Sequence, residues 1–311
     1  MKIDDTFIEK GQSTVVKIPV GQLPSGTPIS LNAFVFRSVN PGPVALVQGG
    51  VHGDEINGVE IVRRVLQEKW FDNLNAGSVI VIPLVNIFGF INFSRDVPDG
   101  KDVNRSFPGV ANGSLASRVA FNISKKIIPL IDFAIDFHTG GKSLFNYPQV
   151  RIAPHHEPSR TLADAFGAPV TVATKLISKS LRKFGIENGK PILVFEGGES
   201  TRLDGFVIKK GMDGIRNVLT AKGMMEGNSM PAKNLFFEKS TWQRAPRSGI
   251  FVWTKSAGAY VNKKEVIGTL GDPYGQKTIP IQAKQSGFII GHNNAPVVNQ
   301  GDALFNIAYS S

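Results

Sequence analysis

The hydrophobic and polar positions of this chain change their pattern twice. In residues 1–42, the segments 13–20 and 30–36 partly alternate apolar and polar side chains, with turn residues between them, which predicts β-strands. From residue 43 to about 228, apolar runs of strand length alternate with amphipathic stretches of helix length. Beyond residue 234, glycines and short apolar runs dominate, and they predict an all-β segment.

The middle part of the chain consists of repeated strand and helix units. Its strand-like runs are almost wholly apolar, as parallel strands covered on both faces are. Its helix-like runs carry apolar residues three or four positions apart. The predicted strands are 44–48, 78–84, 131–137 and 192–195, and the predicted helices are 59–70, 114–128, 159–166 and 212–224. This succession predicts an α/β fold with a mixed, mostly parallel sheet flanked by helices.

We expect two domains, separated by a polar, proline-containing stretch. Residues 1–228 would form the α/β domain, with 1–42 as a β-rich lead-in, and residues 229–311 would form a small β barrel or sandwich. The second domain contains a weak internal repeat, because the sequence SGIF at 248–251 recurs as SGFI at 286–289. Such a repeat is typical of two similar β units that fold together.

The composition indicates a globular protein with a sizeable core. Of the 311 residues, 41% are hydrophobic and 19% are charged, which excludes general disorder. The absence of cysteine excludes disulfides, thiolate metal ligands and cysteine nucleophiles. The chain starts without an apolar signal-peptide region, and no apolar stretch reaches the length of a membrane span. We therefore expect a cytoplasmic protein with no membrane partner.

The formal net charge is +10, and the basic residues are dispersed in pairs such as Arg63-Arg64 and Lys209-Lys210. No long basic run with interleaved aromatic residues occurs, so we expect no nucleic-acid partner. A solvated basic surface explains the charge, and steering of an anionic substrate is the alternative. The sequence leaves the oligomeric state open, and a homo-oligomer is compatible with it.

A glycine-rich stretch at 49–58 joins a predicted strand to a predicted helix and carries two candidate metal ligands. It reads GGVHGDEING, so His52 and Glu55 lie three residues apart. An imidazole nitrogen and a carboxylate oxygen are typical zinc ligands, and glycines allow the positive φ angles that such turns use. The HxxE spacing alone is weak evidence, because chance matches are common.

Two further polar residues, His138 and Glu196, each come directly after a predicted strand. Ligands gather at the carboxyl ends of parallel strands. We therefore expect His52, Glu55 and His138 to form a zinc site whose fourth position is open. For each histidine alone, a hydrogen-bonded structural role is the alternative. Glu196 would act as general acid/base, and Glu199 is its rival, although it lies past two glycines.

The loop at 95–109 carries polar groups suited to substrate binding. It places Arg95, Asn104 and Arg105 among Pro, Gly and Asp residues. Arginine binds carboxylates through two parallel hydrogen bonds, and a positive group beside a metal can stabilise an oxyanion. A surface loop with ordinary ion pairs is the alternative.

These motifs resemble the succinylglutamate desuccinylase/aspartoacylase family, within the zinc carboxypeptidase superfamily. The matching segments occur in the family's order, and the resemblance covers about residues 40–311. They are Gly50-Val51-His52-Gly53-Asp54-Glu55, Asn104-Arg105-Ser106-Phe107-Pro108-Gly109, Asp136-Phe137-His138-Thr139-Gly140 and Phe195-Glu196-Gly197. The chain looks closest to the uncharacterised bacterial deacylase branch, and the resemblance implies a zinc-carboxypeptidase-like fold.

The resemblance also implies a role for each candidate residue. It implies that His52, Glu55 and His138 are the ligands of one Zn²⁺ per chain and that Glu196 is the general acid/base. It also implies that Arg95 polarises the scissile carbonyl and that Asn104 and Arg105 hold a substrate carboxylate. Asp54 and Asp136 would orient ligands or have structural roles.

Two features of the sequence limit the substrate prediction. Aspartoacylases carry a further arginine shortly before the catalytic glutamate, and this chain has none at a clear match. Arg151 and Arg182 are loose candidates. The adjacent pair His155-His156 is expected in a loop, with substrate contact as the alternative.

We therefore expect a zinc-dependent amidohydrolase that removes an acyl group from an N-acylated amino acid or a related small amine. Its partner would be a small anionic N-acyl substrate. A metallocarboxypeptidase acting on peptides and an esterase with the same site are the alternatives. A non-catalytic binding protein is a third reading, although it would have no need of a general base.

Overall fold

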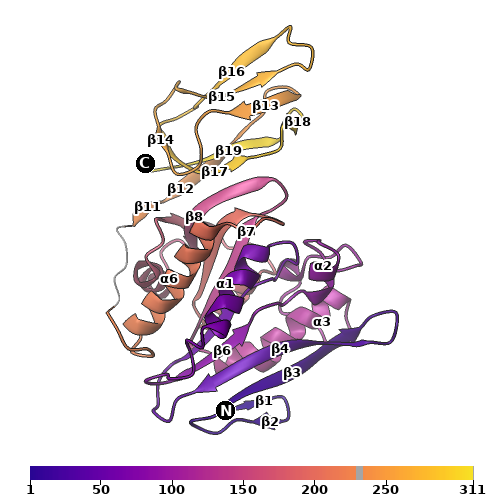
Figure 1. Cartoon of the computed structure of the whole chain (residues 1–311), viewed down its shortest axis with the longest axis vertical. Helices are drawn as coiled ribbons and strands as arrows, with labels where there is room; N and C mark the ends of the chain where they lie inside the picture. The colour runs from indigo at the N-terminus through magenta and orange to yellow at the C-terminus, as the bar shows by residue number, and fades with distance from the viewer. Residues whose placement is uncertain (229–233, 311) are drawn as a thin grey trace.

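A large mixed sheet with helices on both faces forms most of the structure, a computed structural model that describes residues 1–228 and 234–310 (Figure 1). The helices are α1 (Ile56–Gln67), α2 (Ile87–Ile91), α3 (Leu115–Asn122), α4 (Glu157–Phe166), α5 (Leu181–Glu187) and α6 (Gly205–Ala221), with short 3-10 or π turns η1 (Val103–Arg105), η2 (Ile123–Ile127) and η3 (Ile128–Leu130). The strands up to α6 are β1 (Lys2–Ile3), β2 (Thr6–Phe7), β3 (Ser13–Gln22), β4 (Pro28–Arg37), β5 (Val44–Gln48), β6 (Ser78–Ile82), β7 (Phe133–Gly140), β8 (Leu144–Ile152), β9 (Val170–Ala173) and β10 (Ile192–Glu199). The later strands are β11 (Leu235–Phe237), β12 (Lys239–Arg244), β13 (Gly249–Trp253), β14 (Tyr260–Val261), β15 (Val266–Gly271), β16 (Thr278–Gln282), β17 (Gly287–Asn293), β18 (Val297–Val298) and β19 (Ala303–Tyr309).

The main strand order of the large sheet is β12-β19-β17-β8-β10-β7-β5-β6-β4-β3. Its four central strands, β6, β5, β7 and β10, are parallel. Strands β4 and β8 pair antiparallel on either side of them. The predicted fold class is confirmed: a mixed sheet flanked by helices, with a C-terminal all-β region that adds a second sheet, β16-β15-β13-β18.

Alternate residues of the central strands supply two hydrophobic cores. Leu46 and Ile80 point to the face covered by α3 and α5, and Val47 and Val81 point to the face covered by α1, α4 and α6. All four side chains are fully buried. Coverage on both faces explains why the central strands are almost continuously apolar.

Helix α6 begins at Gly205, well before the predicted start at 212. The side chain of Asp204 accepts a hydrogen bond from the amide of Val207 (3.0 Å) and so caps the helix. Glycine weakens helical propensity, but a Cβ at Gly211, within the missed turns, would lie 2.4 Å from the side chain of Ile61 in α1. This glycine is therefore required by close packing against α1, and it weakens the helical signal of the first turns of α6.

The hydrophobic pattern also missed β8, which reads LFNYPQVRI and contains no apolar run. The strand pairs with β10 on one side and with β17 and β9 on the other, so its neighbours rather than its own sequence determine it. Likewise, the predicted helix at 114–128 is α-helical only as far as Asn122 and continues as a π turn.

The two copies of the internal repeat start equivalent strands, β13 and β17, and exchange their partners. Val261 in β14 pairs with Gly287 at the start of β17, and Val298 in β18 pairs with Gly249 at the start of β13. Each short strand thus pairs with the long strand of the other copy. The predicted domain boundary at 228/229 adjoins residues 229–233, which lie outside the described residues, so the division into two domains stays a prediction.

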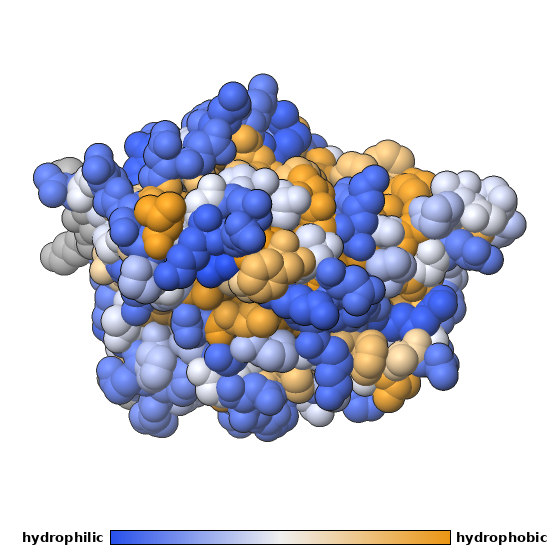
Figure 2. All heavy atoms as spheres, turned by 90° about the horizontal axis from the view of Figure 1, so that it is seen from below, coloured by the Kyte–Doolittle hydropathy of each residue, from blue (hydrophilic) through white to orange (hydrophobic). Residues whose placement is uncertain are grey.

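The face of the molecule seen from below in Figure 2 is covered mainly by hydrophilic side chains, with apolar residues gathered in separate patches. Among the helices in residues 1–228 and 234–310, none has both the length and the hydropathy to cross a membrane.

Candidate active site

The turn between β5 and α1 holds His52 and Glu55 in close contact with α2. Gly50 has a φ of +63°, which a glycine adopts without strain. A Cβ at Gly53 would lie 2.0 Å from the backbone of Gly89 in α2, so only glycine fits between the two segments. The turn therefore fixes where both side chains point, at the carboxyl end of the central strands.

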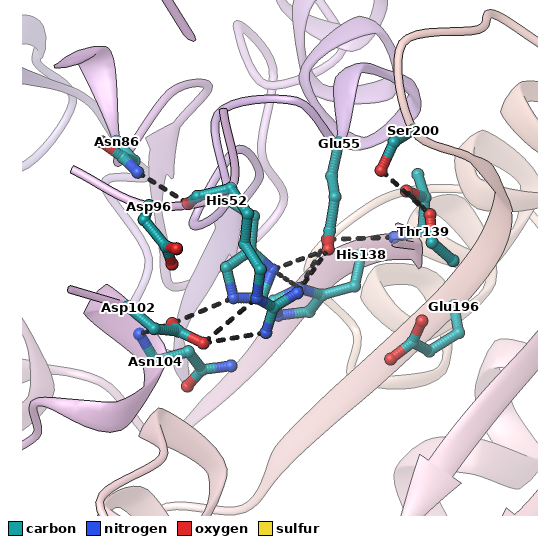
Figure 3. A network of polar contacts seen from close by, with 12 residues as sticks. His52, Glu55, Asn86, Asp96, Asp102, Asn104, His138, Thr139, Glu196 and Ser200 are labelled. Carbon is teal, nitrogen blue, oxygen red and sulfur yellow. Dashed lines mark hydrogen bonds and ion pairs between the residues drawn. The ribbon is translucent and has the colours of Figure 1, made fainter. Parts of the chain in front are cut away.

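His52, Glu55 and His138 are buried and point toward one another (Figure 3). The Nδ1 atom of His52 lies 2.7 Å from Oε1 of Glu55, and Nδ1 of His138 lies 2.8 Å from Oε2 of Glu55. The two Nδ1 atoms are 3.2 Å apart. One ligand atom from each residue lies within 4.8 Å of the others, so a single metal ion can meet all three.

The outer nitrogen of each histidine faces a carboxylate. His52 Nε2 lies 3.2 Å from Asp102, and His138 Nε2 lies 2.9 Å from Asp136. Carboxylates accept hydrogen bonds, so a neutral imidazole here can donate either from Nε2 to the outer carboxylate or from Nδ1 to Glu55. In the Nε2-protonated tautomer, two Nδ1 lone pairs and the carboxylate of Glu55 converge without a proton between them. This donor set fits a cation, and nitrogen and oxygen ligands fit zinc.

The charges around the histidines favour a cation in the same place. Burial opposes charge on His52, but Glu55 and Asp102 outweigh it and raise the pKa of the imidazole. Burial also opposes charge on His138, but Asp136 and Glu55 outweigh it and raise the pKa of this imidazole well above its usual range. Burial would raise the pKa of Glu55, yet the two histidines hold it below its usual range. Three carboxylates thus surround two imidazoles.

Arg95 lies beside this cluster rather than in open solvent. Its guanidinium donates to Asp102 (2.9 and 3.2 Å) and to Oε1 of Glu55 (3.2 Å). Burial acts against its charge, but these carboxylates raise the pKa of Arg95. Arg95 therefore brings a positive charge next to the His-Glu-His set.

Asn104 and Arg105 follow Asp102 on η1 and face the same pocket. The amide of Leu181 donates to Oδ1 of Asn104 (2.9 Å), which fixes the side-chain amide and directs its Nδ2 group away from α5. Arg105 is half exposed, and its Nη1 donates to the backbone oxygen of Asn104 (2.6 Å). An amide donor and a guanidinium thus stand side by side at the pocket wall.

Glu196 is held by two side chains of β8. Asn146 donates to its Oε2 (2.9 Å), and Nη1 of Arg151 lies 3.0 Å from its Oε1. Asn146 and Arg151 are five residues apart and would point to opposite faces of a regular strand. A β-bulge between them, where β8 has one residue more than β10, brings both to the face of Glu196.

Arg182 is 7% exposed, and its Nη2 donates to the backbone oxygens of Thr174 and Lys175. Its Nη1 has no hydrogen-bond partner among the described residues. Burial, followed by the charge of Arg151, lowers the pKa of Arg182 to about 10, which still leaves it charged at pH 7. A buried, incompletely paired guanidinium is costly unless an anion meets it.

One pocket of about 210 Å³ unites these groups. All of the site residues predicted from the sequence line it, namely His52, Glu55, Arg95, Asn104, Arg105, His138 and Glu196. Asn146, Arg151 and Arg182 line it as well, and Trp242 on β12 adds a wall from the C-terminal β-region. Glu199, the rival of Glu196, is not among the lining residues of this pocket.

The sequence pattern missed some residues and left the roles of others open. Asp102 lies two residues before Asn104, in the loop that the sequence analysis singled out for substrate binding, but nothing in the pattern linked its side chain to His52. Asp136 contacts His138, as one of its two predicted roles requires, whereas Asp54 forms its side-chain contact with Ser200. His156 caps α4 by accepting from the amide of Ser159 (3.3 Å).

The fold and the pocket define an α/β protein whose central strand ends present a His-Glu-His set to one small cavity. The model of the succinylglutamate desuccinylase/aspartoacylase catalytic domain matches residues 41–221. The chain belongs to this family.

Similar proteins match along almost the whole chain. An N-alpha-acetyl-L-2,4-diaminobutyric acid deacetylase from Halomonas elongata is 28% identical, over 96% of this chain and 91% of the relative. A solved succinylglutamate desuccinylase/aspartoacylase from Rhodobacter sphaeroides is 26% identical, with a TM-score of 0.84 and 96% of each chain covered. The ectoine utilisation protein EutE (DoeB) from Ruegeria pomeroyi, solved with product bound, has a TM-score of 0.86 at 23% identity, with 96% of this chain and 95% of that chain covered. This last likeness concerns the fold alone.

Proposed function

We propose that this protein is a zinc-dependent deacylase that hydrolyses the amide bond of an N-acylated amino acid or a related small amine. One observation carries the proposal: a buried His-Glu-His set and a separate carboxylate, Glu196, line the same small pocket. The name of the Halomonas relative, a deacetylase of an N-acetylated amino acid, supports it.

His52, Glu55 and His138 would hold the metal ion, and Asp102 and Asp136 would keep the two imidazoles in the tautomer that binds it. When bound, zinc supplies a Lewis acid that polarises a carbonyl and lowers the pKa of water toward 7.

Glu196 would move the proton of the reaction. Its carboxylate takes a proton from the water that attacks the acyl carbonyl and delivers it to the departing nitrogen. Asn146 and Arg151 hold one oxygen each, so the direction of the carboxylate is set before substrate binds. Arg95, whose guanidinium stands beside Glu55, would stabilise the oxyanion as that charge develops.

The arginines of the pocket favour an anionic substrate. Asn104 and Arg105 would bind one carboxylate, and Arg182 offers its Nη1 to a second anionic group. The small volume and the wall formed by Trp242 favour a small molecule over a peptide. An ester of the same shape would meet the same groups, so esterase activity is the second candidate.

The test is a substrate panel on zinc-loaded protein, with metal content measured by elemental analysis. The panel contains acetylated, succinylated and formylated amino acids, N-acetyl-2,4-diaminobutyric acid, the matching esters and short peptides. We expect one metal ion per chain, hydrolysis of at least one acyl-amino acid and inert peptides. Turnover of peptides alone would replace the deacylase by a carboxypeptidase, and no turnover with full metal occupancy would contradict the proposal.

A further inference from the structure

A second cavity lies on the other face of β8. Leu144 and Asn146 line the candidate active site, whereas Phe145 and Tyr147 line a separate cavity of about 770 Å³. Successive side chains of a strand point to opposite faces, so one strand serves both. We call this space the aromatic cavity and define it by Phe145, Tyr147, Phe206, Trp253, Glu199 and Asp204. Its volume lies within the usual range of small-ligand sites.

Aromatic rings from four parts of the chain form the wall, in two groups of contacting rings. The ring of His292 lies 5.2 Å from that of Phe145 and 4.7 Å from that of Trp253. Tyr147, two residues along β8, lies 5.9 Å from Phe206 on α6. Trp253 is 39% exposed and Phe206 is 47% exposed, so both rings remain accessible from solvent.

A hydrogen-bond chain fixes the ring of Trp253 relative to a carboxylate. The indole nitrogen of Trp253 donates to Oδ1 of Asn294 (3.0 Å), and Nδ2 of Asn294 donates to Glu199. Residues from β13, from β10 and from the position directly after β17 are thereby joined. A ring and a carboxylate held in place before binding lose little entropy when a ligand arrives.

The charge of the aromatic cavity is opposite in sign to that of the whole chain. Glu199 and Asp204 form no ion pair with a lysine or arginine among the described residues, and Arg202 is the one basic residue of the lining. Burial lowers the pKa of His292 to about 4, so this ring is neutral at pH 7. Two carboxylates against one guanidinium give a net negative lining in a chain of net charge +10.

We propose that the aromatic cavity binds a small organic cation, an alkylammonium ion, with the ring faces around the positive nitrogen and Glu199 as its counter-charge. Aromatic faces carry negative electrostatic potential, and ring cages recognise quaternary ammonium groups for this reason. Carboxylates alone would equally suit a hydrated metal ion, but the ring wall favours an ion with an apolar surface. The proposal does not depend on the deacylase function, because the two cavities lie on opposite faces of β8.

The test is calorimetric titration of the full chain with choline and with 3,3-dimethylbutan-1-ol, in which carbon replaces the charged nitrogen. We expect saturable choline binding and at least about fivefold weaker binding of the neutral alcohol, in keeping with the strength of cation–π contacts. Equal binding of the two, or no saturable binding of choline up to about 10 mM, would overturn the proposal.

Two variants test the assigned groups, and one serves as the matched control. Glu199→Gln and Trp253→Leu should each weaken choline binding at least about fivefold, with circular dichroism confirming the fold. Glu196→Gln, on the other face of the sheet, should bind choline as the unaltered chain does. Loss of choline binding in Glu196→Gln together with its retention in Glu199→Gln would place the ligand in the candidate active site and contradict the assignment.

Discussion

The candidate active site and the aromatic cavity use opposite faces of the same strand, yet they are built on different physical principles. In the candidate active site, most ionisable groups meet in pairs, namely His52 with Asp102, His138 with Asp136 and Glu196 with Arg151. Arg182, with its incompletely paired guanidinium, is the exception. In the aromatic cavity, rings form the wall and the acidic groups stand without a basic partner among the described residues. The paired groups of the candidate active site suit catalysis at one position, whereas the ring wall of the aromatic cavity suits binding of a ligand through contacts with the ligand's apolar surface.

This contrast shows that the alternating side chains of one strand can serve two different sites. Asn146 and Phe145 are neighbours in sequence, but one fixes a carboxylate and the other supports a ring stack. Substitutions on the two faces should therefore separate cleanly, with chemistry affected on one face and stability or ligand retention on the other.

The largest expected effect is that of Glu196→Gln. Removing the general acid/base should lower acyl-amino acid hydrolysis at least about a hundredfold, while the zinc content stays the same. Turnover and elemental analysis on the same preparation measure both. Glu199→Gln is the matched control, since it changes the same residue type in the same strand but on the face of the aromatic cavity. Near-normal turnover in Glu196→Gln would remove Glu196 from the reaction.

Asp102→Asn should weaken zinc binding about 10- to 100-fold. The amide keeps the size of the side chain but no longer fixes the proton on Nε2 of His52, so the inward lone pair is lost part of the time. Titration against a competing chelator measures the affinity. Asp99→Asn, at an exposed position of the same loop, should leave it unchanged. Equal affinities for the two variants would contradict the role of Asp102.

His292 should make the fold sensitive to acid. The pKa of its imidazole is lowered from 6.5 to about 4 by burial, so the unfolded chain takes up a proton below pH 6.5 while the folded chain resists until about pH 4. Stability from this group is therefore full above pH 6.5 and is lost as the pH falls. Between pH 7 and pH 5 the loss should be about 2 kcal/mol.

Urea unfolding gives the free energy of unfolding of the unaltered chain and of His292→Gln at each pH from 7 to 5. The loss appears as a change with pH in the difference between these two free energies. His155→Gln, at an exposed loop position, is the control and should follow the unaltered chain. If the curve of His292→Gln ran parallel to that of the unaltered chain, the buried imidazole would not be the acid-sensitive group.

The smallest expected effect is that of Arg182→Met. The long apolar side chain fills much of the same space but cannot bind an anion, so KM for an acyl-amino acid with a second carboxylate should rise about tenfold with kcat little changed. For the corresponding substrate without that carboxylate, KM should stay the same. Arg202→Met, in the aromatic cavity, is the control. An equal rise for both substrates would mean that Arg182 serves packing alone.

The sequence predicted the central parallel strands and the groups at their ends, because both signals are local. An apolar run identifies a buried strand, and a polar residue directly after it lies at the edge where parallel strands end, which places His52, His138 and Glu196 together. The family match and the shared fold confirm the recognition and the α/β class. The assignment of roles to these residues stays a prediction.

What the sequence did not show depends on contacts between distant segments. Arg151 reaches Glu196 because a bulge shifts the alternation of β8, and a bulge in a strand without an apolar run leaves no trace in the pattern. Asp102 meets His52 from an irregular loop. The aromatic cavity joins Phe145, Phe206 and Trp253 from three parts of the chain, and none of them stands in a recognisable motif.

Anomalous diffraction at the zinc edge, on crystals of the zinc-loaded protein, is the decisive test of the His52-Glu55-His138 metal site. We predict one strong peak per chain at about 2.0–2.1 Å from Nδ1 of both His52 and His138 and within bonding distance of Glu55, with Glu196 in the same pocket but outside bonding distance. A peak elsewhere in the molecule, or one bonded to Glu196 in place of Glu55, would contradict it.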